Sequence, residues 1–213
     1  MIAVLTRIPE PGRAKSRLVP VLGLRGAAFL ARAMAEDVLE SVRESGLPWK
    51  LCVDGDLEHP WVQAVSEGAS LVEAQPWGDL GARIRHALRN GGVAIGTDAP
   101  TLPVAMLREA YGSNADLVLA PAFDGGYVLV GVSAEAASAG AFDGVPWSSP
   151  ETFAAQVERA RALDLSLRIL PFWYDIDLAA DLDFLRAHLR TLPLSIAPRT
   201  RAFLESRHAS PDR

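Results

Sequence analysis

The sequence predicts a three-layer α/β/α fold with a mostly parallel sheet and helices on both faces. Short, wholly apolar runs alternate along the chain with longer segments whose apolar residues recur at helical spacing. Uninterrupted apolar runs are typical of strands that are buried on both faces of a parallel sheet. The chain has 213 residues, of which 49% are hydrophobic and 22% charged, so one α/β domain accounts for most of it. We expect this domain to cover residues 1–195 and a tail to cover residues 196–213.

The order of the elements follows from the apolar runs and from the glycines and prolines between them. The expected strands are residues 2–5, 51–53, 71–72, 93–95, 117–120, 128–130 and 167–170. The expected helices are residues 24–45, 61–67, 82–90, 104–111, 151–163 and 180–189. Residues 133–149 are expected to form a loop of small residues. The tail is expected to begin with a short polar helix from Arg199 and to end in disordered residues.

Composition excludes several classes of function. The net charge of -5 argues against non-specific binding of nucleic acid. The single cysteine, Cys52, rules out an internal disulfide, and its apolar surroundings predict a buried, inert thiol. No apolar stretch approaches the roughly 18–20 residues that cross a bilayer. We therefore expect a cytoplasmic protein without membrane insertion. No pattern typical of a nucleophile elbow is present, so covalent catalysis is not expected.

A basic loop follows the first expected strand and contains Pro11 and Gly12, which prevent regular structure. Four basic residues lie in this loop: Arg7, Arg13, Lys15 and Arg17. A proline-glycine loop at the carboxyl edge of a sheet can offer backbone N–H groups and cations to a polyphosphate. A solvated turn is the alternative interpretation, and the sequence leaves both open.

Aspartates follow three of the expected strands. Asp98 comes just after residues 93–95, at the sheet edge where open α/β folds bind their ligands. It could instead cap the next helix, but Pro100 and Pro103 intervene, so we favour a metal ligand. Asp124-Gly125 lies between two apolar runs and predicts a hairpin turn, which can also bring backbone amides to a substrate.

Asp175 and Asp177 lie between the last strand and the last helix of the expected domain. One of them is expected to cap the N-terminus of that helix. The other could complete a metal site with Asp98 if the two segments are neighbours. Carboxylate oxygens suit Mg²⁺, which usually shares its ligands between protein and phosphate.

Six motifs stand in a fixed order along residues 2–190. They are Arg7-x-Pro9-x-Pro11-Gly12-x-x-Lys15-Ser16-Arg17-Leu18, Gly78-Asp79-Leu80-Gly81-x-Arg83, Gly96-Thr97-Asp98-x-Pro100-x-Leu102, Asp124-Gly125-Gly126-Tyr127, Trp147-Ser148 and Asp175-Ile176-Asp177. Together they resemble the DUF2064 family of GT-A-fold proteins, whose members are usually labelled glycosyltransferases. That family is similar in turn to the molybdenum-cofactor and phospholactate guanylyltransferases. The chain departs from the family pattern at residues 178–180, where Leu-Ala-Ala replaces Thr-Pro-Glu.

The resemblance implies a nucleotide-diphospho-sugar transferase fold with one antiparallel strand, after Asp124-Gly125-Gly126. It implies nucleotide binding by Arg7, Pro11, Gly12, Arg13, Lys15, Arg17, Gly78, Asp79, Gly81 and Arg83. It implies a divalent metal, Mg²⁺ or Mn²⁺, at Asp98, with Asp175 and Asp177 as the further candidate ligands. The acceptor would lie at Asp124, Gly125, Gly126, Tyr127 and Trp147.

Three functions remain open, and each uses a nucleotide. The first is a glycosyltransferase with a sugar-nucleotide donor and a small-molecule acceptor, which the family label favours slightly. Against it, Thr97-Asp98-Ala99 lacks the Asp-x-Asp that many GT-A sugar transferases place at the metal. The second is a nucleotidyltransferase that joins a nucleoside monophosphate to a phosphorylated acceptor and releases pyrophosphate, with Lys15 and Asp98 as catalytic residues. The third is a non-catalytic nucleotide-binding protein. The sequence does not determine the oligomeric state.

Overall fold

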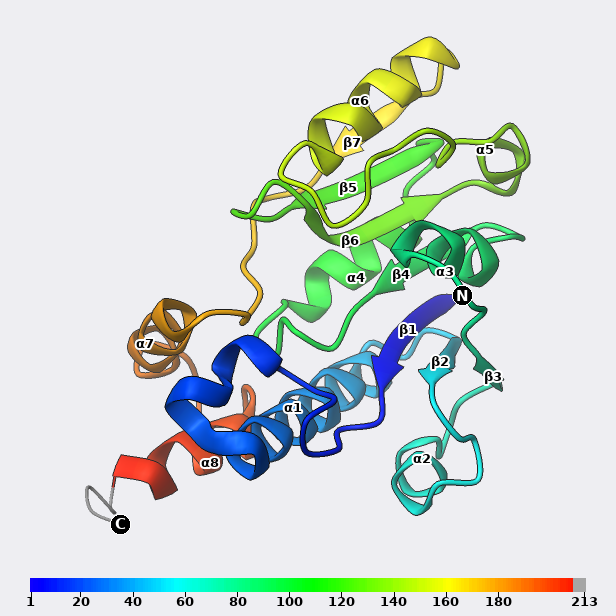
Figure 1. Ribbon diagram of the computed structural model, residues 1–213. Helices are drawn as coiled ribbons and strands as arrows, with labels where there is room; N and C mark the ends of the chain where they lie inside the picture. Colours follow the sequence, from blue (N-terminus) through cyan, green and yellow to red (C-terminus); the bar gives the residue numbers. More distant parts are fainter. Residues whose placement is uncertain (209–213) are drawn as a thin grey trace.

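A seven-stranded sheet forms the middle layer of the computed structural model, which describes residues 1–208 (Figure 1). The strand order is β3-β2-β1-β4-β6-β5-β7. Strand β6 runs antiparallel to β4 and β5, and the other neighbouring strands are parallel. The strands are β1 (Ile2–Arg7), β2 (Trp49–Asp54), β3 (Leu71–Ala74), β4 (Gly92–Ile95), β5 (Leu117–Pro121), β6 (Tyr127–Val132) and β7 (Leu167–Ile169). The predicted α/β fold with one antiparallel strand is confirmed.

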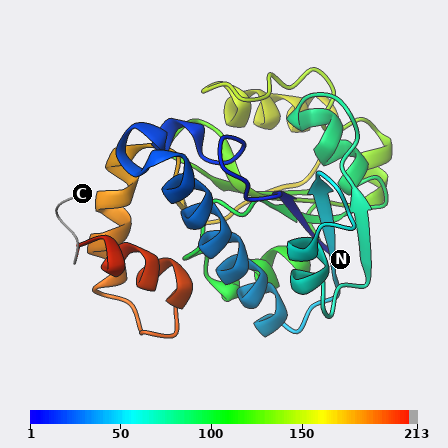
Figure 2. The same ribbon diagram turned by 60° about the horizontal axis from the view of Figure 1, so that its bottom comes forward.

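Helices cover both faces of the sheet, as Figure 2 shows. One face packs against α1 (Val19–Glu44), α2 (Pro60–Val65) and α4 (Val104–Tyr111). The other face packs against α3 (Leu80–Ala87), α5 (Ala134–Ser138) and α6 (Thr152–Ala162). The other helices of the described residues are α7 (Ala179–Leu189), α8 (Pro198–His208) and the 3-10 turn η1 (Ser16–Leu18).

Alternate residues of each central strand enter opposite cores. In β1, Ile2 and Val4 lie in the core beneath α1, whereas Ala3 lies in the core beneath α3. Because both faces are buried, the strand has no polar alternation, and this is why the uninterrupted apolar run predicted it.

A third, smaller core joins the N-terminal half of α1 to α7 and α8. It contains Leu30 and Met34 from α1, Leu185 from α7 and Leu204 from α8. The buried carboxylate of Asp37 accepts hydrogen bonds from the first backbone N–H groups of α8, at 3.2 and 2.7 Å. The polar tail helix expected from Arg199 is therefore held against α1.

Two elements differ most from the expectation, and the bounds of others shift by a few residues. Residues 133–149 contain the short helix α5, and the hydroxyl of Ser133 caps it by accepting from the Ala136 N–H at 3.1 Å. Helix α1 begins five residues earlier than residue 24, because it continues across a kink at Gly23, whose φ is 69°. The disordered end that we expected falls on residues 209–213, which lie outside the described residues.

The stretch Ser16–Glu44 is long and apolar enough to cross a membrane, by length and composition only. The expectation that no such stretch exists is therefore wrong. Half of its most apolar window is buried inside the protein, where Leu30, Met34 and Leu39 contribute to two cores. A core helix passes the same test as a membrane span, so this helix is weak evidence for membrane insertion.

Candidate functional site

A cavity of about 700 Å³ lies at the edge of the sheet where the parallel strands β1, β2 and β4 end. Its wall is formed by the loop after β1, the β4–α4 loop, the β5–β6 turn, residues 148–150 and the segment before α7. This is the edge at which the aspartates and the basic loop were expected to meet, and the structure brings both to the same cavity.

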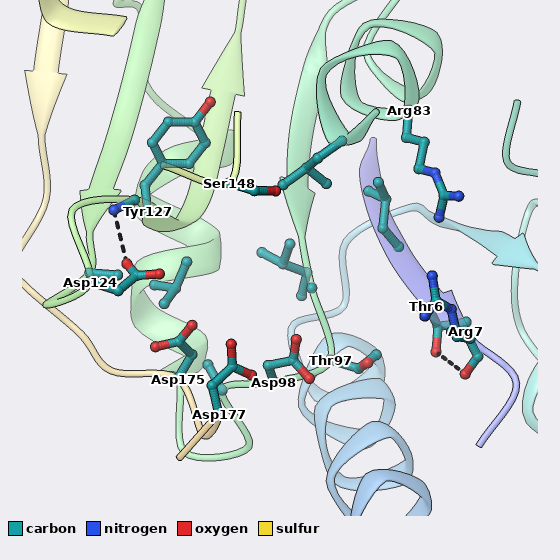
Figure 3. Close-up of a pocket in the computed structure, with 18 of the residues that line it drawn as sticks. Thr6, Arg7, Arg83, Thr97, Asp98, Asp124, Tyr127, Ser148, Asp175 and Asp177 are labelled. Carbon is teal, nitrogen blue, oxygen red and sulfur yellow. Dashed lines mark hydrogen bonds between the residues drawn. The ribbon is translucent and has the colours of Figure 1, made fainter. Parts of the chain in front are cut away.

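Four aspartates gather on one side of the cavity, and Arg7 and Arg83 lie on the other (Figure 3). The aspartates are Asp98, Asp124, Asp175 and Asp177. The backbone N–H of Ile176 donates to the carbonyl of Asp98 at 2.9 Å. The segment before α7 and the end of β4 are therefore neighbours, which was the condition for a metal site shared between them.

The carboxylates create an excess of negative charge at this end. The pKa of Asp175 is raised to about 6, mainly by burial and further by the negative charges of Asp124, Asp177 and Asp98. Asp175 forms no ion pair within residues 1–208. A cation bound nearby would stabilise the ionised form of this carboxyl group.

The expectation that Asp175 or Asp177 caps α7 is wrong. The cap is provided by Asp181, inside the first turn, whose carboxylate accepts from the N–H groups of Leu178 at 2.6 Å and Asp177 at 2.9 Å. A carboxylate at this helix position can reach back to the unpaired amides of the helix start. The side chains of Asp175 and Asp177 are therefore both available to the cavity.

Lys15 bridges the predicted metal ligands. Its Nζ lies 2.6 Å from Asp98 Oδ1 and 2.7 Å from Asp177 Oδ1, and its side chain is only 7% exposed. Burial alone would lower the pKa of Lys15, but the charges of Asp98 and Asp177 outweigh it and raise this pKa. Arg17 reaches the other oxygen of Asp177 at 3.7 Å from a side chain that is 70% exposed.

At the opposite end, Asp54 joins two of the predicted nucleotide-binding arginines. Arg7 Nη2 lies 2.7 Å and Arg83 Nη1 lies 2.8 Å from Asp54 Oδ2. Arg83 also donates to Gln75 Oε1 at 3.1 Å. Burial would raise the pKa of Asp54, but hydrogen bonds from Arg83 and Arg7 outweigh it and lower this pKa. The two guanidinium groups are thus held in place before any ligand binds.

The sequence did not single out Asp54 or Gln75. Asp54 ends the apolar run of β2 just as Asp98 follows that of β4. The argument that placed Asp98 at the ligand-binding edge of the sheet therefore applies to Asp54 as well. Other polar residues of the wall have no such signal, and they are Thr6, Thr97, Ser148, Ser149 and Thr152. Ser148 has a φ of 55°, which is uncommon for a residue other than glycine.

The acidic end fits a hard cation in its chemistry. Asp98 and Asp177 already converge on one positive charge, the ammonium of Lys15, and carboxylate oxygens are the ligands that Mg²⁺ and Mn²⁺ accept. Among residues 1–208, no three Asp, Glu, His or Cys side chains are arranged to hold a metal by themselves. The remaining ligands would come from phosphate and water, as is usual for Mg²⁺.

The β5–β6 turn is the hairpin that Asp124-Gly125 predicted. Asp124 accepts from the N–H of Gly126 at 2.9 Å, and Gly125 has a φ of 88°. A Cβ on Gly125 would also collide with the backbone of Pro150.

The hydroxyl of Tyr127 donates to Gln156 Oε1 at 3.4 Å, and burial raises the pKa of this tyrosine. Asp124, Gly126 and Tyr127 line the cavity.

Several residues of the predicted site are not among those that line the cavity. They are Pro11, Gly12, Gly78, Asp79, Gly81, Gly125 and Trp147. Asp79 caps α3 by accepting from the Ala82 N–H at 2.7 Å. Trp147 covers Gly81 so closely that a Cβ there would overlap its ring, and it meets the ring of Tyr127 edge-on at 6.2 Å. Trp147 therefore packs against both Gly81 and Tyr127, and Tyr127 lines the cavity.

Comparison with solved structures agrees with this architecture. A protein of Desulfovibrio desulfuricans G20, provisionally assigned as a nucleotide-diphospho-sugar transferase, is 29% identical, with a TM-score of 0.86 over 98% of this chain and 95% of that one. A cytidylyltransferase from Leptospira borgpetersenii is 9% identical, with a TM-score of 0.57 over 98% and 94% of the two chains. A CMP:2-keto-3-deoxy-manno-octonic acid synthetase in complex with CTP is 11% identical, with a TM-score of 0.53 over 90% and 98%. The last two show the fold alone.

Among curated proteins, none matches this chain. The family model described as "Uncharacterized protein conserved in bacteria (DUF2064)" matches residues 38–149, which is just over half of the chain. With the strand order, the cavity at the carboxyl edge and the structural likeness over nearly the whole chain, we conclude that this protein belongs to the DUF2064 family and has a nucleotide-diphospho-sugar transferase fold.

Proposed function

We propose that this protein is a transferase that depends on Mg²⁺ or Mn²⁺ and uses an activated nucleotide, and that its reaction is glycosyl transfer from a sugar nucleotide. The observation that carries this proposal is the pairing of charges in one cavity. Lys15, Arg13 and Arg17 supply cations to the wall. Lys15 pairs with Asp98 and Asp177, and Arg17 approaches Asp177. A nucleoside diphosphate with a bound metal needs both kinds of group, because its phosphates bind cations and its metal binds carboxylates.

Each part of the donor has a candidate partner in this arrangement. The phosphates would lie beside Lys15 and Arg17, and the nucleoside would extend toward Arg7 and Arg83. Asp98 and Asp177 would hold the metal, which supplies positive charge to the phosphate oxygens of the leaving group when it is bound. Because Lys15 is buried, its charge acts through a poorly screened environment and stabilises charge that develops on those oxygens.

The acceptor would lie between Asp124 and the loop at Ser148. In glycosyl transfer an acceptor hydroxyl attacks the anomeric carbon, the bond to the nucleoside diphosphate breaks, and the hydroxyl proton must be removed. Asp124 lines this end of the cavity and can accept that proton. Hydroxyl groups at Ser148, Ser149 and Thr152 can exchange hydrogen bonds with a sugar. The likeness over the whole chain to the Desulfovibrio protein supports this reaction.

Nucleotidyl transfer is the second candidate, and the position of Lys15 favours it. One strand-end carboxylate, Asp98, pairs directly with the lysine of the first loop. In this reaction a phosphorylated acceptor attacks the α-phosphorus and pyrophosphate leaves. Lys15 would neutralise charge on the α-phosphate. The altered residues 178–180 motivate the third candidate, a non-catalytic nucleotide-binding protein.

Thermal unfolding against a panel of ligands tests the proposal. Sugar nucleotides and nucleoside triphosphates are added singly, with and without Mg²⁺. A ligand at a hundred times its dissociation constant stabilises by about 2.7 kcal/mol, which shifts the midpoint by roughly 5–10 °C in a domain of this size. We expect a Mg²⁺-dependent shift with sugar nucleotides. A shift with one triphosphate alone would favour nucleotidyl transfer, with pyrophosphate release as the next assay. The absence of a shift with every ligand would contradict nucleotide binding, and with it all three candidates.

A further inference from the structure

We propose that Lys15 makes metal binding depend on the nucleotide, because its ammonium group occupies the position between Asp98 and Asp177 until phosphates draw it away. This inference rests on the proposed function for the identity of the ligands. It adds that the two ligands bind cooperatively: the free protein binds the metal weakly, and the protein with bound phosphates binds the metal tightly.

The buried side chain of Lys15 forms an ion-pair cluster with Asp98 and Asp177. Its Nζ lies within 2.7 Å of one oxygen of each carboxylate, and the side chain is 7% exposed. The backbone of Lys15 has a left-handed conformation, with a φ of 49°, at the start of η1. Arg17, which also approaches Asp177, is 70% exposed and lies farther away at 3.7 Å.

Electrostatics explains why the free protein should bind a metal weakly. A divalent cation that uses both Asp98 and Asp177 must either break two ion pairs to a buried ammonium or lie beside it. The first option leaves a buried charge without a partner, which is costly, and the second places like charges a few ångströms apart. Asp175 and Asp124 have no ion pair within residues 1–208, but in that part of the chain neither belongs to a group of three Asp, Glu, His or Cys side chains that could hold a metal by itself.

A polyphosphate removes both obstacles at once. Its oxygens offer Lys15 a new anionic partner and complete the ligand set of the metal. Binding of phosphate and metal should therefore be cooperative. Because coupling between two sites is reciprocal, the metal should raise the affinity for the phosphate ligand by the same factor.

Mn²⁺ affinity without nucleotide tests the first half of this proposal. Free Mn²⁺ is followed by electron paramagnetic resonance during titration of the wild-type protein and of Lys15→Met and Arg17→Met. We expect Lys15→Met to bind Mn²⁺ about tenfold more tightly than wild type, near the low end of typical site-to-site coupling. Arg17→Met is the matched control, since it also removes a cation from Asp177, and we expect less than about a threefold change because its pair is exposed. Circular dichroism checks that each variant is folded.

The wild-type protein provides a second test that needs no substitution, because its only lysines are Lys15 and Lys50. Lysine labelled with ¹³C at Cε gives one signal from each. Lys50 pairs with Glu73 at 2.7 Å outside the cavity wall, so it is an internal reference. We expect the Lys15 signal to move when UDP, GDP or inorganic pyrophosphate is added, and to stay in place with Mg²⁺ alone. The Lys50 signal should not move.

The outcomes separate this inference from the proposed function. If wild type binds Mn²⁺ as tightly as Lys15→Met, or Mg²⁺ alone moves the Lys15 signal, the inference is overturned while the metal site stands. If neither Mn²⁺ nor any phosphate ligand binds wild type or Lys15→Met, the inference and the proposed function both fail. If the phosphates bind but Mn²⁺ never does, the inference fails and the proposed function loses its metal, whereas nucleotide binding remains.

Discussion

At the scale of single residues, the candidate site is a set of charges held by one another rather than by apolar packing. Asp54 fixes Arg7 and Arg83 through one oxygen, and Lys15 fixes Asp98 and Asp177 through one nitrogen. Such pairs orient ligand-binding groups before the ligand arrives, which lowers the entropy that binding costs. Substitution of single residues should therefore change ligand binding more than folding.

Asp98→Asn should abolish metal-dependent nucleotide binding and leave the fold intact. The amide keeps the shape of the side chain but removes the negative charge that a divalent metal requires. We expect the Mg²⁺-dependent thermal shift to disappear. The control is Asp143→Asn, an aspartate that is 61% exposed and absent from the cavity wall. An unaltered nucleotide affinity with Mg²⁺ in Asp98→Asn would remove Asp98 from the metal site.

Gly81→Ala should destabilise the protein by about 1–3 kcal/mol, because its methyl group would overlap the ring of Trp147. Chemical denaturation measures the loss. In a double-mutant cycle, Trp147→Leu should remove much of the penalty, since residues in contact are energetically coupled. Additive effects of the two substitutions would show that the two residues do not touch as described.

At the scale of elements, a buried hydrogen-bond network places the acidic segment beside β4. The Tyr174 hydroxyl bonds Thr101 Oγ1 at 2.9 Å and His188 Nδ1 at 2.7 Å, so it links the β4–α4 loop to α7. Trp173 Nε1 adds a bond to Thr101 at 3.3 Å. The segment that carries Asp175 and Asp177 has no strand or helix of its own, and this network holds it in place.

Tyr174→Phe should lower the free energy of unfolding by about 1–2 kcal/mol, because it removes the hydrogen bonds of the Tyr174 hydroxyl to Thr101 and His188. It should also weaken metal-dependent nucleotide binding severalfold, since the aspartates on either side of Ile176 lose their support. Denaturation and the thermal-shift assay measure the two effects. Tyr111→Phe is a suitable control, because Tyr111 is 40% exposed at the end of α4. A loss of stability without any loss of ligand affinity would contradict the positioning role.

Glu73 joins β2, β3 and the end of α3 through Lys50 and Arg89. Burial would raise its pKa, but hydrogen bonds from Arg89 and Lys50 outweigh it and lower this pKa from 4.5 to about 2. The stabilisation is therefore fully present above pH 4.5 and is lost as the pH falls toward 2. Glu73→Gln should cost about 2 kcal/mol at pH 7, and its difference from wild type should shrink over that acidic range. Urea denaturation against pH measures both, and a constant difference would contradict the low pKa.

The elements that sequence reasoning found and missed differ in how much local signal they have. Strands β1, β4 and β5 were predictable because both of their faces are buried. Helix α5 was missed because five residues rich in alanine resemble a loop of small residues, although Ser133 was an available cap. The cap of α7 was misassigned because the sequence places aspartates both before the helix and in its first turn, and only the hydrogen bonds show that Asp181 is the one used.

At the scale of the whole molecule, the site draws on segments that are distant in sequence but end at one sheet edge. Asp98, Asp124 and the basic loop could be placed at this edge from the sequence alone, because each follows a predicted strand and ligands bind where parallel strands end. The pairing of Lys15 with Asp98 and Asp177, and of Asp54 with two arginines, depends on side-chain directions in three dimensions. No spacing in the sequence encodes those directions, so the charge pairs became visible only in the structure.

The single thiol should report unfolding of the whole molecule. Cys52 is buried in the middle of β2, as predicted, and burial raises the pKa of its thiol to about 12. We expect no reaction with a disulfide reagent in the native state at pH 8, and a reaction rate that rises with denaturant in parallel with loss of circular dichroism. Reaction at a rate independent of denaturant would indicate local opening of the β2–β3 edge instead.

The reversed direction of β6 has a consequence for how this family can diversify. The side of the cavity that we propose for the donor is formed by loops that follow parallel strands, and each of these loops leads into a helix, so a change in them disturbs the layers. The β5–β6 turn reaches the same edge as a hairpin, and its length can change while both strands keep their register. Under the proposed function, grafting this turn from a relative should therefore transfer the preference for the acceptor and leave recognition of the nucleotide intact.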